Sequence, residues 1–335
     1  MKKKLFALVM TMLMVLSLAA CGGDNNKTPG SSTVGAKTDT NTVAVGAVVI
    51  ARDDVPEDDV YAFVSAIFEN IDTITGQHNK GGELDLDFAA SVTSVPYHPG
   101  AARYFAEKGK NVASVKDGAG VGESRPLTFG TGGETGTYYA FGGVLSSYVS
   151  NNTGVSVTAV TSGGSKANIE DLSAGDIQLG FVQSDVMSYG YNGERLFDSA
   201  VTNFSVVAAL YMEQVQIVTT NPDIQTVADL AGKTVSIGAQ GSGVWFNAVD
   251  VLSIYDIDPD TGIKPVYQDF GNSAESLKDK KIDAAFIVAG APTPAIVDLA
   301  ASGEVYLVSL DEAHTGSLLE TSPYYSAYTI PAGTY

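Results

Sequence analysis

Cysteine and histidine are scarce in this chain of 335 residues. It contains one cysteine, Cys21, and three histidines, His78, His98 and His314. A single cysteine excludes an intrachain disulfide and argues against a cysteine-based metal site. The histidines are scattered, without the spacing of metal ligands or of a nucleophile–base pair. We therefore expect no metal site and no cofactor.

Positive charge is also scarce. The sequence has 19 Lys and Arg residues against 38 Asp and Glu residues, a formal net charge of −19, and three of the lysines lie within the first four residues. Nucleic-acid binding depends on Lys and Arg contacts to phosphates, so this composition argues against it. It argues equally against adsorption to an anionic membrane surface. A small anion would have to be bound by local donors such as helix N-termini.

The N-terminal 20 residues are typical of a secretory signal, with a basic start followed by an apolar stretch over residues 5–18. They end in Leu-Ala-Ala-Cys-Gly, which resembles a bacterial lipobox and predicts lipidation of Cys21. The alternative is a plain signal with an incidental cysteine. Residues 21–41 contain almost no large apolar side chain and are predicted to form a flexible tether.

Three segments have the pattern strand, glycine-rich loop, helix. They span residues 127–145, 155–172 and 234–252. The first turn of a helix has backbone N–H groups without an intrahelical partner, and the helix dipole adds positive potential there. Glycines let a ligand approach these groups closely. One such segment is more often an ordinary turn, but three in one chain favour a shared pocket for an anion or carboxylate.

Strands and helices alternate along most of the remaining chain. Residues 42–51 form a continuous apolar run that predicts a strand buried on both faces, and residues 60–71 have the spacing of an amphipathic helix. Residues 204–218 are long enough to pass from one domain to another. The fold class is therefore α/β, and two lobes with a cleft between them fit these segments.

Several motifs resemble those of TAXI-type solute receptors of TRAP transporters. They are GTGGETGTYY at 130–139, TSGGS at 161–165, QSD at 183–185, DLAGK at 229–233, GSG at 241–243, IDAAF at 282–286 and IPAGTY at 330–335. The resemblance covers residues 127–335 in the family's order. It implies a type II periplasmic-binding fold, in which two α/β lobes close on a ligand. It also implies a small organic anion, such as glutamate or another carboxylate, that is handed to an ion-driven TRAP permease in the membrane.

The order of the segments departs from the family. Residues 42–109, with PYHPGAARY at 96–104, resemble the part that normally follows IPAGTY, so the chain is predicted to be circularly permuted. The expected organisation is the following: signal 1–20, tether 21–41, a family C-terminal segment 42–109 packed on lobe 1, linker 110–126, lobe 1 over 127–212, lobe 2 over 213–304, and a return to lobe 1 over 305–335.

The resemblance and the loop chemistry together predict the ligand-binding residues. Hydroxyls and backbone amides would bind carboxylate oxygens, a tyrosine would cover the apolar part, and Asp185 or Glu213 would meet an ammonium if the ligand is an amino acid. Ser165 is also a candidate N-cap. The predicted residues are Gly132, Gly133, Thr137, Tyr138, Ser162, Ser165, Asn168, Gln183, Asp185, Glu213, Ser242, Gly243, Asn247, Gly290 and Pro292.

An enzyme is the main competing class. Residues 130–136 do not form a complete G-x-G-x-x-G, because position 135 is Thr, and GGSKA at 163–167 lacks the last glycine of a nucleophile elbow. We expect no catalytic activity. A binding protein of an ATP-driven importer and a ligand sensor would share the fold, so the sequence leaves both open. In each case membrane contact would be through the lipid anchor alone.

Overall fold

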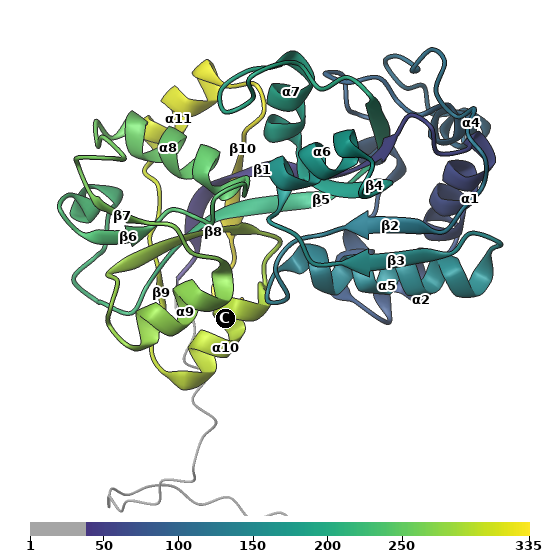
Figure 1. Ribbon diagram of the computed structural model, residues 1–335. Coiled ribbons are helices and arrows are strands. Elements are labelled where there is room, and N and C mark those ends of the chain that lie inside the picture. Colours follow the sequence, from purple (N-terminus) through teal and green to yellow (C-terminus); the bar gives the residue numbers. More distant parts are fainter. Residues whose placement is uncertain (1–37) are drawn as a thin grey trace, which may run out of the picture. The chain divides into compact units, whose positions relative to one another are not determined.

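The computed structural model describes residues 38–335, so the predictions for the signal, Cys21 and most of the tether lie outside the described residues. The strands form one ten-stranded sheet with the order β3-β2-β4-β1-β5-β8-β6-β7, in which β10 also pairs with β1 and β9 with β5. Two groups of strands and helices are joined by β1 and β5, and we call them lobe 1 and lobe 2 (Figure 1). The prediction of an α/β fold with two lobes is confirmed.

Lobe 1 is a parallel set of three strands covered by helices, and β4 additionally pairs with β1 in the antiparallel direction. Its strands are β2 (Leu127–Gly130), β3 (Val157–Val160) and β4 (Leu179–Gln183). Its helices are α1 (Glu57–Phe68), α2 (Ile71–Thr75), the 3₁₀ turn η1 (Asn79–Glu83), α3 (Leu86–Ala89), α4 (Pro99–Glu107), α5 (Thr137–Asn152), α6 (Ser165–Ala174) and α7 (Ser184–Asn192).

Lobe 2 contains the remaining elements, with β6 between β8 and β7 in parallel pairing. Its strands are β6 (Thr234–Ser236), β7 (Lys264–Val266), β8 (Ala284–Ala289), β9 (Tyr306–Leu307) and β10 (Ser326–Ile330). Its helices are the 3₁₀ turn η2 (Val227–Leu230), α8 (Val244–Ile254), α9 (Phe270–Lys278), α10 (Pro294–Ser302) and α11 (Glu312–Thr321).

The two long strands β1 (Thr40–Arg52) and β5 (Phe204–Thr219) belong to both lobes. They pair antiparallel from Ala44↔Gln214 to Arg52↔Phe204. The first part of β1 pairs with β10 and its second part with β4, while the second part of β5 pairs with β8. Both strands are buried almost throughout, which explains their continuous apolar sequence. The middle of this pair is therefore the connection about which the lobes can move.

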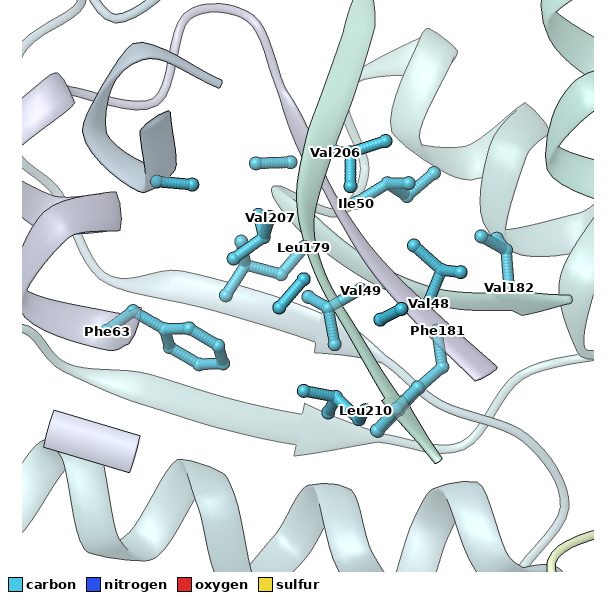
Figure 2. Close-up of a cluster of buried hydrophobic side chains, with 14 of the residues drawn as sticks. Val48, Val49, Ile50, Phe63, Leu179, Phe181, Val182, Val206, Val207 and Leu210 are labelled. Atoms are coloured by element: carbon cyan, nitrogen blue, oxygen red, sulfur yellow. The ribbon is translucent and has the colours of Figure 1, made fainter. Parts of the chain in front are cut away.

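The core of lobe 1 includes side chains from the segment 42–109. Figure 2 shows Phe63 of α1, Val49 of β1 and Leu179 of β4 gathered in this buried cluster. The ring of Phe63 meets Phe129 of β2 edge-on, with centroids 6.0 Å apart. Burying a side chain of this size contributes about 2–3 kcal/mol. Residues 42–109 thus pack on lobe 1 and share its sheet, which is the arrangement that a circular permutation requires. The permutation itself stays a prediction.

The C-terminal residues 305–335, which we expected to return to lobe 1, pack mainly with lobe 2. Val308, Leu310, Leu318 and Tyr325 lie in the same buried cluster as the side chains of α8. Strand β10 pairs with the first part of β1, where Ile330 lies opposite Thr40. The reason is that β10 reaches β1 on the side of the crossing that faces lobe 2.

The helices of the described chain are too short or too polar to cross a membrane. Within residues 38–335 no helix combines the length and the apolar character that such a crossing requires. The same residues contain no group of three or more His, Cys, Asp or Glu side chains arranged to hold a metal ion.

Candidate ligand-binding site

The three glycine loops line one cavity of about 240 Å³ between the lobes. Loop 130–136 and loop 161–164 belong to lobe 1, and loop 238–243 belongs to lobe 2. The cavity is lined by ten of the predicted site residues, and by others that include Gly136, Gly164, Asp269, Phe270 and Val288. The ten are Gly132, Gly133, Thr137, Tyr138, Ser162, Ser165, Gln183, Glu213, Ser242 and Gly243. That these residues bind a ligand stays a prediction.

Each loop leads directly into a helix whose N-cap is glycine. The N-caps are Gly136 for α5, Gly164 for α6 and Gly243 for α8, and none of them forms a side-chain cap hydrogen bond. The first-turn N–H groups of three helices therefore start at the cavity wall without the usual side-chain acceptor. Ser165 is the first residue of α6 rather than its N-cap, and its Oγ accepts from the backbone N–H of Gln183 at 3.1 Å.

The charged side chains at the cavity are both acidic. Glu213 and Asp269 line it, whereas none of the lining residues, all within the described part of the chain, is Lys, Arg or His. Glu213 is 2% exposed, and its Oε2 accepts from the Tyr138 hydroxyl at 2.6 Å. Burial raises the pKa of Glu213 to about 8, against the lowering effect of the Tyr138 hydrogen bond. The cavity thus combines positive helix ends with one buried carboxyl group.

Aromatic and aliphatic side chains complete the cavity wall. The ring of Tyr138 stacks on Phe181 with centroids 4.6 Å apart and planes at 8°. Phe270, Val244 and Val288 contribute from lobe 2. The stacking fixes Tyr138 so that its hydroxyl reaches Glu213 while its ring covers the apolar side. A ligand with one apolar portion between polar ends fits this distribution.

Hydrogen bonds join the two lobes around the cavity. Thr137 Oγ1 donates to the Gly290 carbonyl at 2.8 Å, and the backbone N–H of Ala167 donates to the Gly241 carbonyl at 3.1 Å. Gln183 Nε2 donates to Asn247 Oδ1 at 2.9 Å. These contacts join elements of lobe 1 directly to elements of lobe 2, so the structure shows the lobes in a closed arrangement.

Asn168 does not line the cavity, contrary to our expectation. It is fully buried, and its Nδ2 donates to the carbonyls of Thr131 at 2.8 Å and Phe181 at 2.7 Å. Thr131 lies just beyond the carboxyl end of β2, and Phe181 lies in the middle of β4. Asn168 therefore ties β2 and β4 together below the loops. Its amide donates to these carbonyls and is not available to a ligand.

Asp185 and Asn247 also lie outside the cavity wall. Asn247 Nδ2 donates to Asp185 Oδ2 at 2.9 Å and to the Tyr325 hydroxyl at 2.8 Å. Both residues are fully buried, and burial raises the pKa of Asp185 to about 7. Asp185 in α7 and Asn247 in α8 thus form a contact between the lobes. The spacing from Gln183 to Asp185 places Asp185 in the first turn of α7, with its side chain directed toward α8.

The turn that contains Gly290 and Pro292 lies behind the cavity rather than in its wall. The Gly290 carbonyl accepts from Thr137, and the Ala291–Pro292 peptide bond is cis. The neighbouring Val288 and Ala289 line the cavity instead. The strand β8 thus reaches the cavity with its last residues, and the turn that follows it does not line the cavity.

Sequence reasoning missed two contributions to the site. Asp269 and Phe270 line the cavity at the start of α9, where Asp269 is an N-cap that accepts from the backbone N–H of Asn272 at 2.7 Å. From the sequence alone, residues 266–270 suggest a strand, whereas β7 ends at Val266 and Asp269 is already the N-cap of α9. An Asp directly before a helical pattern was the available signal. The second is Lys80, from the 3₁₀ turn η1 in the segment 42–109. It does not line the cavity but acts electrostatically on Glu213, and the sequence around it gave no signal of this effect.

Solved structures of solute-binding proteins align with this chain over part of its length. The periplasmic aliphatic sulphonate binding protein SsuA from Escherichia coli is 19% identical, with 63% of this chain and 62% of that chain covered and a TM-score of 0.38. The alkanesulfonate-binding protein SsuA from Xanthomonas axonopodis pv. citri, bound to MOPS, is 19% identical, with coverage of 59% and 71% and a TM-score of 0.38. A glutathione import structure from Streptococcus mutans is 11% identical, with coverage of 62% and 82% and a TM-score of 0.39. The chain therefore spans less than two thirds of the first of these proteins.

A sequence profile gives the broader match. The profile of the NMT1-like family covers residues 25–109 and residues 129–335, so that it includes β1, the three glycine loops, Glu213 and Lys80. This is well over half of the sequence, and the protein belongs to the NMT1-like family.

Proposed function

We propose that this protein is an extracytoplasmic solute-binding protein that captures a small amino acid or related amino carboxylate. The observation that carries the proposal is the meeting of three helix N-termini without side-chain caps and one buried acid, Glu213, at a single cavity between two lobes. The helix ends would bind the ligand carboxylate. Glu213 would accept from the ligand ammonium, because a buried carboxylate needs a positive partner.

The size of the cavity supports a small ligand. Its volume of about 240 Å³ is below the roughly 300–1,000 Å³ that is typical of sites for drug-sized ligands. A metabolite of the size of glutamate matches this volume. Among the described lining residues there is no His, Cys or Lys that could act with a serine hydroxyl as a nucleophile–base pair. We therefore propose binding without catalysis.

The resemblance to TAXI-type receptors supports delivery of the ligand to a TRAP-type secondary transporter. Closure about β1 and β5 would bring the surfaces of both lobes into one arrangement, which a membrane permease can distinguish from the open form. A binding protein of an ATP-driven importer and a ligand sensor would use the same closure. Finding genes for TRAP permease subunits, rather than for an ATPase, beside this gene would favour the first of these.

Ligand-induced closure is the direct test of the binding function. We expect L-glutamate or another amino acid to raise the midpoint of thermal unfolding, with a stabilisation of about 2.7 kcal/mol at a ligand concentration 100 times the dissociation constant. The same ligand should reduce the radius of gyration in small-angle scattering. A screen of amino acids together with their deaminated di-acid counterparts provides the matched controls. Scattering that is unchanged by every ligand that stabilises the protein would contradict closure.

We also propose that the protein is anchored to the cell membrane by a lipid on Cys21. The supporting observation is that the only cysteine of the sequence lies at the lipobox position. Palmitate labelling in the native host should be strong for the wild type and absent for Cys21→Ala. Cys21→Ala should also move the protein from the membrane fraction to the soluble fraction. Equal labelling of the two proteins would rule out the anchor.

A further inference from the structure

Lys80 is a buried cation that lies behind the cavity wall. It belongs to η1 and is 1% exposed, and it is the only Lys or Arg among residues 38–335 that is buried to this extent. Its backbone N–H donates to Nδ1 of His78 at 3.2 Å, and the His78 ring packs on Phe141 of α5 with centroids 5.1 Å apart. The turn that carries Lys80 is therefore fixed against lobe 1.

The ammonium of Lys80 has three partners. It donates to the Ala291 carbonyl of lobe 2 at 2.9 Å, forms an ion pair with Glu83, and lies 5.4 Å from the centroid of the Tyr211 ring. Gly290 makes room for it, because a Cβ at that position would lie 2.5 Å from Lys80 Cε. Glu83 is 40% exposed, so water screens the ion pair on that side. The inner side of the ammonium faces Tyr211 without such screening.

Tyr211 and Glu213 lie on the same face of β5, because residues two apart in a strand point in the same direction. Lys80 therefore lies on the face of β5 from which Glu213 enters the cavity. The titratable groups that act on Glu213 are Tyr138, Asp185 and Lys80, and Tyr211 lies beside it. Burial and Asp185 raise the pKa of Glu213, whereas Tyr138 and Lys80 lower it. Lys80 is the only cation in this set.

We propose that Lys80 is a specificity-determining positioning residue: from behind the cavity wall, its ammonium supplies part of the countercharge that Glu213 needs, so that a ligand ammonium completes it and Glu213 meets the ligand as a carboxylate. The inference rests on the proposed function for the nature of the ligand. A cation in the cavity wall would compete with a ligand ammonium for Glu213. A cation one layer behind supports the carboxylate and leaves its open side to the ligand. The cavity would thereby prefer an amino carboxylate to the corresponding di-acid.

The first test needs no ligand. The carboxyl groups of glutamate residues are labelled with ¹³C, and the Glu213 resonance is identified by its absence in Glu213→Gln. In Lys80→Met we expect the titration midpoint of Glu213 to move up by about one pH unit, the effect of losing one buried opposite charge behind the cavity wall. Lys80→Arg should stay near the wild type. Glu83→Gln, a substitution at a half-exposed position, should move the midpoint down, because it leaves the Lys80 charge uncompensated.

The second test uses L-glutamate and glutarate, which differ by the ammonium group. Lys80→Met should bind L-glutamate about tenfold more weakly at pH 7, with recovery near pH 9, and should bind glutarate as the wild type does. Equal weakening of both ligands at both pH values would indicate a merely structural role and overturn the proposal.

The two tests separate the failure of this inference from that of the proposed function. An unchanged Glu213 midpoint in both Lys80→Met and Glu83→Gln would overturn the countercharge. If Lys80→Met does not fold, an unchanged midpoint in Glu83→Gln alone would overturn it. If the Glu213 midpoint shifts in these variants but the wild type binds neither L-glutamate nor glutarate, the electrostatic role of Lys80 would be upheld. The proposed ligand class would be overturned.

Discussion

The affinity for L-glutamate is expected to rise about tenfold for each pH unit up to about pH 8 and to level off above it. The pKa of Glu213 in the closed, ligand-free cavity is raised to about 8 by burial, so the carboxyl group holds a proton at neutral pH. A ligand ammonium beside it favours the ionised form, and binding must then release this proton. Below about pH 8 the release of this proton costs binding free energy, and above it Glu213 is already ionised and binding releases no proton. Calorimetric titration between about pH 6 and pH 9 measures this dependence.

Glutarate should behave in the opposite way. It presents a carboxylate where glutamate presents an ammonium, so the protonated form of Glu213 can donate to it and the ionised form repels it. Its affinity should be constant below about pH 8 and fall above that value. The difference in slope between the two ligands isolates Glu213 from any group that acts on both. Parallel profiles for the two ligands would contradict the assignment of Glu213 to the ammonium.

Glu213→Gln should remove the pH dependence and weaken L-glutamate binding about 100-fold at pH 8, as expected when one partner of a buried charge pair is lost. The loss should shrink as the pH falls, because the wild type itself becomes protonated. Asp185 is the matched control, since its pKa is raised to about 7 by burial but its side chain contacts Asn247 instead of lining the cavity. Asp185→Asn should therefore retain the opposite pH dependences of the two ligands, with their midpoint moved to lower pH because the Asp185 charge raises the pKa of Glu213.

The parts of the site that could be predicted from the sequence are those fixed by local structure. A strand followed by glycines and a helix places backbone N–H groups at the strand's carboxyl end, and this holds for Gly132, Ser165 and Gly243 without knowledge of the tertiary fold. The long strand β5 was predictable for a similar reason, because a continuous apolar run indicates burial on both faces. Glu213 stands out as a charged exception within that run.

The parts that could not be predicted depend on which way a side chain points and on distant contacts. Asn168 and Asp185 lie one turn from cavity-lining residues, but their side chains point to carbonyl groups and to α8 respectively. Periodicity alone does not distinguish these directions in a short helix. Lys80 lies more than 100 residues before Glu213, and only the packing of η1 against the Gly290 turn brings the two together. Such contacts depend on how the segment 42–109 docks on the rest of the chain.

Gly243→Ala is expected to keep the fold and to abolish closure. A Cβ at this position would lie 1.6 Å from Gln183 Oε1 and 2.9 Å from Ser165 Oγ, both of which belong to lobe 1. The backbone φ of Gly243 is −68°, which alanine adopts without strain, so the substitution acts only when the lobes meet. Closing would require Gln183 to move and to give up its hydrogen bond to Asn247. We expect ligand affinity to fall about 30- to 100-fold and compaction to be lost in small-angle scattering.

Gly154→Ala is the matched control, because Gly154 is an exposed loop residue outside the cavity wall and a Cβ there would meet no atom within 4 Å. It should bind and close like the wild type, which separates the clash at Gly243 from a general effect of replacing a loop glycine by alanine. Adding Gln183→Ala to Gly243→Ala removes the nearest obstructing atoms and should restore part of the compaction. Because the obstructed contact lies between the lobes and not within either core, unfolding of the ligand-free Gly243→Ala protein should match that of the wild type. A Gly243→Ala protein that loses stability but still compacts with ligand would contradict this prediction. It would mean that closure does not bring the start of α8 against Gln183.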